Sequence, residues 1–295
     1  MLKDNVNGFF MALADSVPGV SGGTVAFILG FYDQFIGSID QFIFGDLPHK
    51  KKAFSYLFRL GIGWLVGMGL AVLVLNALFE QNIHFVSSLF IGFILGSLPI
   101  VCMEEREALH HLKKGIPYLI FGIALIFGIT YLNTQMQATA MDLSHFSIGL
   151  GIQLFLIGMV AISAMFLPGV SGSTILLIFG VYMPMMNALK ELMQFHLVYL
   201  PAIIIFIFGI LAGAASVVRL IQAGLENHRP QMIYFILGMM AASLYAVKMG
   251  PTTLRVPQVP LTGSNFHIVA CLIGIALVVG MHIRSVALST DTPLD

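Results

Sequence analysis

The stretch ADSVPGVSGGTVAFILGFYDQFIGSI at residues 14–39 is matched by AMFLPGVSGSTILLIFGVYMPMMNAL at residues 164–189. The two stretches lie 150 residues apart, and ten of their 26 positions carry the same residue. The core of the match is PGVSG-T, followed six residues after the threonine by G-x-Y. A match of this kind predicts that the chain is built from two copies of one unit, which decides how the whole fold is interpreted.

The repeat continues downstream of the motif. FILG at 93–96 recurs at 235–238, and GIALIFG at 122–128 resembles GIALVVG at 274–280. The offset between the copies changes, so we place insertions in connecting loops, near residues 47–53 in the first half and 251–264 in the second. Each unit is then one PGVSG segment followed by three apolar spans. The predicted boundaries are 1–142 for repeat one, with its hairpin at about 5–44, and 143–295 for repeat two, with its hairpin at about 146–194.

The composition predicts an integral membrane protein. The chain is 58% hydrophobic and 9% charged, whereas a soluble domain carries roughly 25% charged residues. The net charge of zero gives no electrostatic footprint for nucleic acid. The two cysteines, Cys102 and Cys271, have no metal-binding spacing. The first ten residues do not resemble a secretory signal, so we expect them to remain on the mature protein.

Apolar runs of the length that crosses a bilayer, about 20 residues, recur along the chain. The plain spans are predicted near 54–78, 85–103 and 116–132 in repeat one, and near 197–221, 232–247 and 266–283 in repeat two. Around the second motif, apolar sequence runs from about 148 to 189 with one interruption at 167–173. That run is too long for one span and fits a hairpin, either re-entrant or fully spanning.

With a hairpin, each unit crosses the membrane an odd number of times. Two such units are inverted relative to each other, as in many secondary transporters. The predicted fold is therefore all-α and integral to the membrane, with two inverted repeats. In this arrangement 11 of the 14 Lys and Arg residues lie on one side, which the positive-inside rule makes cytoplasmic. A single broken crossing in place of each hairpin gives a similar division of 10 to 4, so segment length favours the hairpin. Both termini are then cytoplasmic.

The motif residues predict a helix break in each half. Proline ends a helix, and glycine permits backbone conformations that other residues avoid. We therefore assign Pro18, Gly19, Pro168 and Gly169 the role of shaping the hairpins. A new helix begins after each break, with Ser or Thr as its cap. The N–H groups and the positive end of such a helix favour an anion. The candidate substrate-binding residues are Ser21, Gly22, Gly23, Thr24, Ser171, Gly172, Ser173, Thr174 and Arg219.

Each of these residues also has a structural interpretation. A lone Pro-Gly in a membrane helix is most often a packing kink, but two copies at matching positions favour a functional site. Asp15 lies in an apolar stretch, where acids are usually functional, and it is the candidate for carrying a coupling proton. The alternative is an Asp that faces water at a helix end. Arg219 is expected either to contact an anionic headgroup or to extend its side chain to the membrane surface. For the matching Tyr32 and Tyr182, packing is the simpler account.

The sequence shows no motif for a cofactor or a catalytic metal. The nine histidines have no HExxH spacing, and GVSGGT and GVSGST lack the lysine of a phosphate-binding loop that binds ATP. We expect no metal, no cofactor, no catalytic residue and no enzymatic activity. Without an ATP site, the energy for transport has to come from an ion gradient, the membrane potential or the substrate gradient.

The doubled elements ADSVPGVSGGT…GFY and PGVSGST…GVY resemble one family of bacterial polytopic membrane proteins. These are the undecaprenyl-phosphate translocases (PopT), formerly catalogued as a domain of unknown function. The resemblance covers nearly the whole chain and, for site residues, extends to 15–24 and 168–174. It implies a flippase in the bacterial inner (cytoplasmic) membrane, which returns undecaprenyl phosphate to the cytoplasmic face. The lipid carrier is then reused for peptidoglycan and other cell-envelope polymers.

Other functions fit parts of the sequence. The same helix-terminus chemistry suits a transporter of a small soluble anion such as phosphate or chloride. A membrane enzyme acting on polyprenyl phosphates needs an acid, base or nucleophile, and Asp15 is the main candidate. A purely structural membrane protein leaves the doubled motif unexplained. The expected partners are the polyprenyl phosphate and the bilayer, and the sequence leaves the oligomeric state open.

Overall fold

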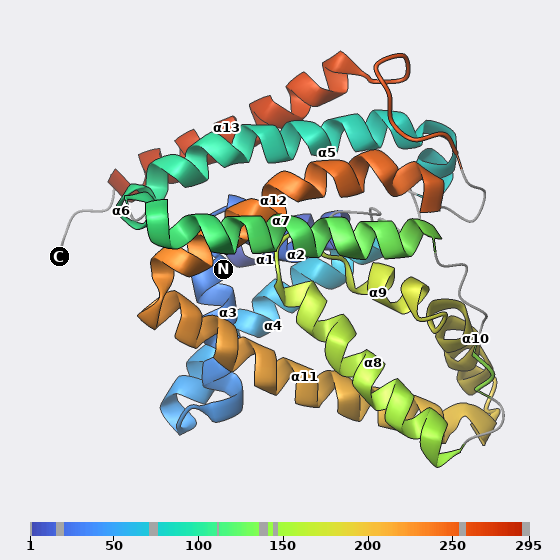
Figure 1. The fold of residues 1–295 in the computed structure, drawn as a ribbon. Coiled ribbons are helices and arrows are strands. Elements are labelled where there is room, and N and C mark those ends of the chain that lie inside the picture. The colour runs from blue at the N-terminus through green and yellow to red at the C-terminus, as the bar shows by residue number, and fades with distance from the viewer. Residues whose placement is uncertain are drawn as a thin grey trace.

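The fold is all-helical across the residues that the structure describes. The computed structural model describes residues 2–15, 21–70, 76–110, 112–135, 141–143, 147–253 and 258–290. Within these ranges the helices of the second half follow the order of those in the first, as the internal repeat predicts. Figure 1 shows how the two sets of helices lie together in one body.

Each half contains a short helix directly after its motif, and this helix is followed by a second, longer one. The helices of the first half are α1 (Leu2–Asp15), α2 (Gly22–Ile28), α3 (Tyr32–Phe44), α4 (Leu47–Leu70), α5 (Asn76–Glu104), α6 (Arg106–Leu109) and α7 (Leu112–Gln135). Those of the second half are α8 (Ile148–Phe166), α9 (Gly172–Ile178), α10 (Tyr182–Met193), η2 (Leu197–Tyr199), α11 (Leu200–Asn227), α12 (Arg229–Met249), η3 (Gly250–Thr253) and α13 (Ile268–Thr290).

The chain is a multi-pass membrane protein. In the described residues, six helical segments are long and apolar enough to cross a bilayer: 47–70, 82–104, 112–133, 148–166, 197–227 and 229–252. Five of them match predicted plain spans, and α8 lies at the start of the segment for which the second hairpin is predicted. The sixth predicted span corresponds to the shorter apolar segment Ile268–Gly280. These positions confirm the membrane fold class and the placing of the spans.

The prediction of a loop at residues 47–53 is wrong, because α4 begins at Leu47 and includes the lysine run. Two local features explain the early start. The carboxylate of Asp46 accepts a hydrogen bond from the backbone N–H of His49 at 3.2 Å, as a capping residue does. Pro48 occupies the first turn, where a helix has no internal use for the missing N–H.

Pairs of glycines set the closest helix contacts, and they do so in the same way in both halves. A side chain at Gly67 of α4 would come within 2.6 Å of the carbonyl oxygen of Phe9 on α1. Gly213 of α11 would come equally close to that of Met159 on α8. Four residues earlier on the same helices, Gly63 lies against the carbonyl oxygen of Asn5 on α1, and Gly209 lies against that of Phe155 on α8. The small-xxx-small spacing, a known signal for close packing in membranes, therefore joins α1 to α4 and α8 to α11.

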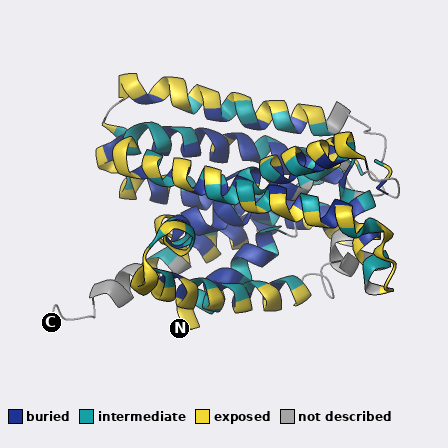
Figure 2. Cartoon of the chain, turned by 90° about the horizontal axis from the view of Figure 1, so that it is seen from below, coloured by how far each residue is buried: buried dark blue, intermediate teal, exposed yellow. Residues whose placement is uncertain are grey.

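The remaining spans pair across the two halves. Gly92 of α5 lies against Cys271 of α13, and Gly238 of α12 lies against Leu119 of α7. In Figure 1 the four helices α5, α7, α12 and α13 form one group in the upper part of the view. Helices α4, α8 and α11 lie below this group. Buried residues gather between the groups and exposed ones follow the outer faces (Figure 2). Many of those exposed residues are large and apolar, as expected for surfaces that face lipid.

Candidate functional site

The first helix break lies between α1 and α2. Helix α1 ends at Asp15, and α2 begins at Gly22 with Ser21 at its N-cap. The Ser21 hydroxyl oxygen accepts a hydrogen bond from the backbone N–H of Thr24 at 3.2 Å, which is the cap expected of a serine at this position. The predicted end of one helix and the predicted start of the next are therefore both confirmed. Pro18 and Gly19, the predicted shaping residues of this break, lie outside the described residues.

The second break lies between α8 and α9. Helix α8 ends at Phe166, and α9 begins at Gly172 with Ser171 at its N-cap. Pro168 and Gly169 lie in the break, as predicted. Gly169 has a φ of +90°, and a Cβ there would lie 3.0 Å from the carbonyl oxygen of Met239 on α12. Both the left-handed backbone and this close approach require glycine.

The two breaks are hydrogen-bonded to each other. The backbone N–H of Gly169 donates to Oγ1 of Thr24 at 2.7 Å. The hydroxyl of Ser21 donates to the carbonyl oxygen of Leu167 at 3.3 Å. Ser21 and Thr24 are almost completely buried. Their hydroxyls therefore hold the second break against the start of α2, and the expected meeting of the two motifs is observed.

Helix α2 and the start of α3 also pack on the end of α8. The Tyr32 hydroxyl donates to the carbonyl oxygen of Phe166 at 2.8 Å, inside the buried core. A Cβ at Gly23 would lie 3.1 Å from that same oxygen and 3.2 Å from the carbonyl oxygen of Met165. Packing alone was expected for Tyr32, but its hydroxyl also satisfies one of the last carbonyls of α8, which lack partners within their own helix.

Both carboxylate oxygens of Asp15 have partners. Oδ1 accepts from the backbone N–H of Gly22 at 2.6 Å, and Oδ2 accepts from the indole Nε1 of Trp64 on α4 at 3.0 Å. The carboxylate therefore lies at the start of α2, where the positive end of the helix favours an anionic group. Met165 is the counterpart of Asp15 in the second half, and its side chain lies over Gly172 at the start of α9 in the same manner.

A cavity of about 230 Å³ lies beside Asp15. Five helices form its wall: α1, α2, α3, α4 and α8. The lining residues are Met11, Asp15, Gly22, Gly23, Phe35, Leu57, Leu60, Gly61, Trp64, Ile162, Met165 and Phe166. The wall is apolar apart from the Asp15 carboxylate, the Trp64 indole N–H and the backbone at the start of α2. Most ligand pockets have this combination of an apolar wall and few polar groups.

Sequence reasoning placed some of these residues in the site and missed others. Asp15, Gly22 and Gly23 line the cavity as candidates from the first motif. The wall residues of α3, α4 and α8 were missed. The role of Trp64 could have been predicted from one feature of the sequence. It is the only tryptophan in the chain, and a tryptophan in an apolar span normally requires a hydrogen-bond partner for its N–H.

The second-motif candidates lie at the start of α9, where Ser171, Gly172, Ser173 and Thr174 form the cap and first turn. Ser171, Gly172 and Thr174 are not among the described residues that line the cavity. Arg219 is exposed on α11, and its guanidinium lies 4.5 Å from the centre of the Phe44 ring. The structure therefore brings the two breaks together but leaves Arg219 away from them.

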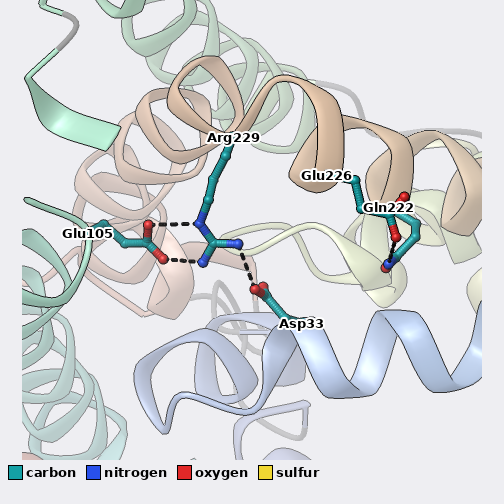
Figure 3. Close-up of polar contacts among 5 residues, drawn as sticks. All are labelled: Asp33, Glu105, Gln222, Glu226 and Arg229. Carbon is teal, nitrogen blue, oxygen red and sulfur yellow. Dashed lines mark hydrogen bonds and ion pairs between the residues drawn. The ribbon is translucent and has the colours of Figure 1, made fainter. Parts of the chain in front are cut away.

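An ion network ties the first hairpin to the neighbouring spans (Figure 3). Arg229, the first residue of α12, donates from Nε and Nη2 to the Glu105 carboxylate at 3.0 and 2.5 Å. Its Nη1 donates to Asp33 at 2.8 Å. Asp33 directly follows Tyr32 at the start of α3. The start of α3 is therefore held to Arg229 through Asp33 and to the end of α8 through Tyr32.

The described residues contain no group of three or more His, Cys, Asp or Glu side chains arranged to hold a metal ion. The polar chemistry of the site consists of the Asp15 carboxylate, the hydroxyls of the breaks and the backbone groups at the starts of two short helices.

Comparison with known proteins identifies the family. Residues 11–263 match the family described as undecaprenyl phosphate translocase-like. A protein of Staphylococcus aureus named polyprenyl-phosphate transporter is 36% identical over 253 residues, covering 84% of this chain and 87% of the relative. A Vibrio cholerae protein of the same name is 32% identical over 242 residues, covering 77% and 71%. No solved structure matches the chain. The chain therefore belongs to the undecaprenyl phosphate translocase-like family of membrane proteins.

Proposed function

We propose that this protein is a flippase for undecaprenyl phosphate and returns the lipid carrier across the bacterial cytoplasmic membrane for reuse in peptidoglycan and other envelope polymers. Its family and the names of its relatives support a polyprenyl phosphate as the substrate. The observation that carries the proposal is the hydrogen-bonded contact of the two motif breaks beside a cavity that contains Asp15. A doubled, interlocked break of this kind is typical of transporter substrate sites.

The Asp15 carboxylate marks the proposed position of the phosphate. Its Oδ1 already accepts a hydrogen bond from the N–H of Gly22, so a carboxyl oxygen occupies the start of α2 in the structure. We place a phosphate oxygen of the substrate at this position after Asp15 has been protonated or has turned away. Gly22 and Gly23 supply backbone N–H groups, and Ser21 and Thr24 keep the site attached to the second break. In the second half, the starting turn of α9 from Ser171 to Thr174 is the proposed counterpart.

Arg219 has a separate place in this proposal. It lies outside the cavity and is exposed, so we assign it to the headgroup when the lipid arrives at or leaves the membrane surface. A guanidinium group suits a phosphate because it donates two parallel hydrogen bonds.

The proposed topology has inverted units, returning hairpins and cytoplasmic termini. Helix α1 has 14 residues and is therefore about 21 Å long, less than the roughly 30 Å of the hydrocarbon core. Helix α2 has only seven residues. These lengths favour a first hairpin that enters the membrane and returns to its starting side. The charge distribution of the loops supports placing that side in the cytoplasm.

Protonation of Asp15 is the proposed coupling step. An ionised carboxylate at the start of α2 repels a phosphate, and a neutral one does not. Met165 occupies the matching place in the second half, so the coupling is asymmetric. Transport that leaves the lipid chemically unchanged fits the naming of both relatives as transporters. Incubation of purified protein with polyprenyl phosphate and pyrophosphate, followed by a phosphate-release assay, tests whether the protein also has enzymatic activity.

The deciding experiment measures binding of undecaprenyl phosphate to purified protein in detergent, with inorganic phosphate and a neutral polyprenol as separate competitors. We expect tight binding that neither competitor displaces, because the site recognises the headgroup and the chain together. Displacement by inorganic phosphate at equal potency contradicts the lipid assignment and leaves the transporter of a small soluble anion. Movement of the lipid between leaflets of protein-containing vesicles then measures the transport itself.

A further inference from the structure

The cavity beside Asp15 is built from residues that the second half does not repeat. Gly209 and Gly213 of α11 each lie 146 positions after their packing counterparts Gly63 and Gly67 of α4. With this same offset, Gly61 and Trp64 correspond to Ile207 and Ile210. Asp15 corresponds to Met165. The first half therefore has an open position, an indole donor and a carboxylate where the second half has three plain apolar side chains.

Gly61 opens the cavity toward the outer surface of the spans. A Cβ built at Gly61 meets no heavy atom within 4 Å, although this residue lines the cavity. Its neighbours Phe58 and Leu65 on α4 are 58% and 66% exposed, on the face that lipid covers. Met165 of α8, on the opposite wall, is 37% exposed. The cavity therefore opens sideways between α4 and α8.

Away from the start of α2, the cavity wall suits hydrocarbon. Among the described residues that line the cavity, only Asp15 has an ionisable side chain. Leu57, Ile162 and Phe35 contribute apolar surface. The volume of about 230 Å³ is below the roughly 300–1,000 Å³ of pockets that hold whole small ligands. Only a short part of a long lipid fits inside.

We propose that this cavity binds the isoprene units next to the headgroup of a polyprenyl phosphate, and that the chain passes through the opening at Gly61 into the bilayer. The inference rests on the proposed function and adds to it a separate site for the isoprenoid chain of the lipid. In this arrangement the phosphate lies at the helix starts, the first isoprene units lie against Leu57 and Ile162, and the rest of the chain stays in lipid.

The expected effect of closing the opening at Gly61 follows from the surroundings of the lipid's isoprenoid chain. Lipid tails are as apolar as the cavity wall, so the chain gains packing contacts in the cavity and little hydrophobic free energy. Closing the opening therefore changes where the chain lies, and how fast the lipid moves, more than it changes whether the lipid stays with the protein.

The test uses undecaprenyl phosphate that carries a photoreactive diazirine on its first isoprene unit, added to the full-length protein in vesicles. In the wild type, we expect cross-links to peptides that contain Leu57 to Trp64 of α4 and Ile162 to Phe166 of α8. Gly61→Ile, which introduces the residue of the second half, should reduce these cross-links and the transport rate about tenfold. Gly69→Ile is the matched control, because Gly69 is on the same helix and its Cβ also meets open space. Both variants should fold, since glycine is a poor helix former at such positions.

The outcomes separate this inference from the function on which it rests. Wild-type transport with unchanged cross-links in Gly61→Ile, or with cross-links on other helices, overturns the chain site and leaves the flippase in place. Equal losses in Gly61→Ile and Gly69→Ile also overturn it, because the effect is then not specific to the opening. Absence of saturable cross-linking and transport in the wild type removes the proposed function and the chain site together.

Discussion

The backbone N–H of Gly22 donates a hydrogen bond to Oδ1 of Asp15 at 2.6 Å, so the last residue of α1 closes the start of α2 across the first helix break. The other oxygen of the same carboxylate is held by Trp64. A carboxyl group of the protein itself therefore occupies the place that we propose for the substrate phosphate. The second half has Met165 over the start of α9, so the two breaks differ in the side chain that covers the new helix.

Asp15→Asn is expected to bind undecaprenyl phosphate more tightly than the wild type and to transport it more slowly. Asparagine keeps an oxygen for the N–H of Gly22 but removes the negative charge that a phosphate has to displace. Binding titrations and vesicle transport, each measured from acidic to alkaline pH, check this expectation. The wild type should show a pH dependence that Asp15→Asn lacks. An identical pH profile in the two proteins argues against Asp15 as the coupling group.

Thr24→Val should destabilise the contact between the two breaks. Valine has a similar shape but removes the 2.7 Å acceptor of the buried Gly169 N–H, which then has only the longer contact to Oγ of Ser21 at 3.3 Å, and the loss of one hydrogen bond costs about 1 kcal/mol. Thr24→Ser keeps the hydroxyl and should lose much less. Thermal unfolding of both variants in the same detergent measures the difference. Equal stability of the two variants contradicts a structural role for this hydroxyl.

Tyr32→Phe removes the hydroxyl that donates to the carbonyl oxygen of Phe166 at 2.8 Å. The expected loss is about 1 kcal/mol of unfolding free energy, with slower transport because the end of α8 is less firmly held against the start of α3. Tyr118→Phe on α7 is the control, since Tyr118 is 46% exposed. If both variants lose the same stability, the effect is due to the general loss of a phenol and not to this bond.

Arg229→Lys should have a small effect on stability, about 1 kcal/mol or less. The side chain of Arg229 is 41% exposed, and solvent screens its attraction to Glu105 and Asp33. Lysine keeps the charge but cannot form the two parallel hydrogen bonds that arginine forms with Glu105. Melting temperatures at low and high salt test this, and the difference between wild type and variant should shrink at high salt. A loss of several kcal/mol at both salt concentrations contradicts a screened surface network.

The sequence alone determined the membrane class, the repeat, the spans and the positions of both breaks. These features depend on local chemistry. Apolar runs of sufficient length require a bilayer, and proline with glycine ends a helix wherever the pair occurs. Ser21 at the N-cap of α2 is an example, since its hydrogen bond to Thr24 spans only three residues. The early start of α4 was also readable from Asp46 and Pro48, although the change of offset between the repeats led to the prediction of a loop there.

Only the tertiary structure decided which residues complete the site. Trp64 reaches Asp15 across 49 positions of sequence, and Tyr32 reaches Phe166 across 134. Such contacts depend on how closely α1, α4 and α8 approach one another, and that approach is set by glycines that allow backbone contact. The repeat predicts two equivalent halves, but the space beside Asp15 is lined by Gly61 and Trp64, and the matching residues of the second half are Ile207 and Ile210. A void of this kind results from the packing of five helices together, and no local pattern of residues specifies it.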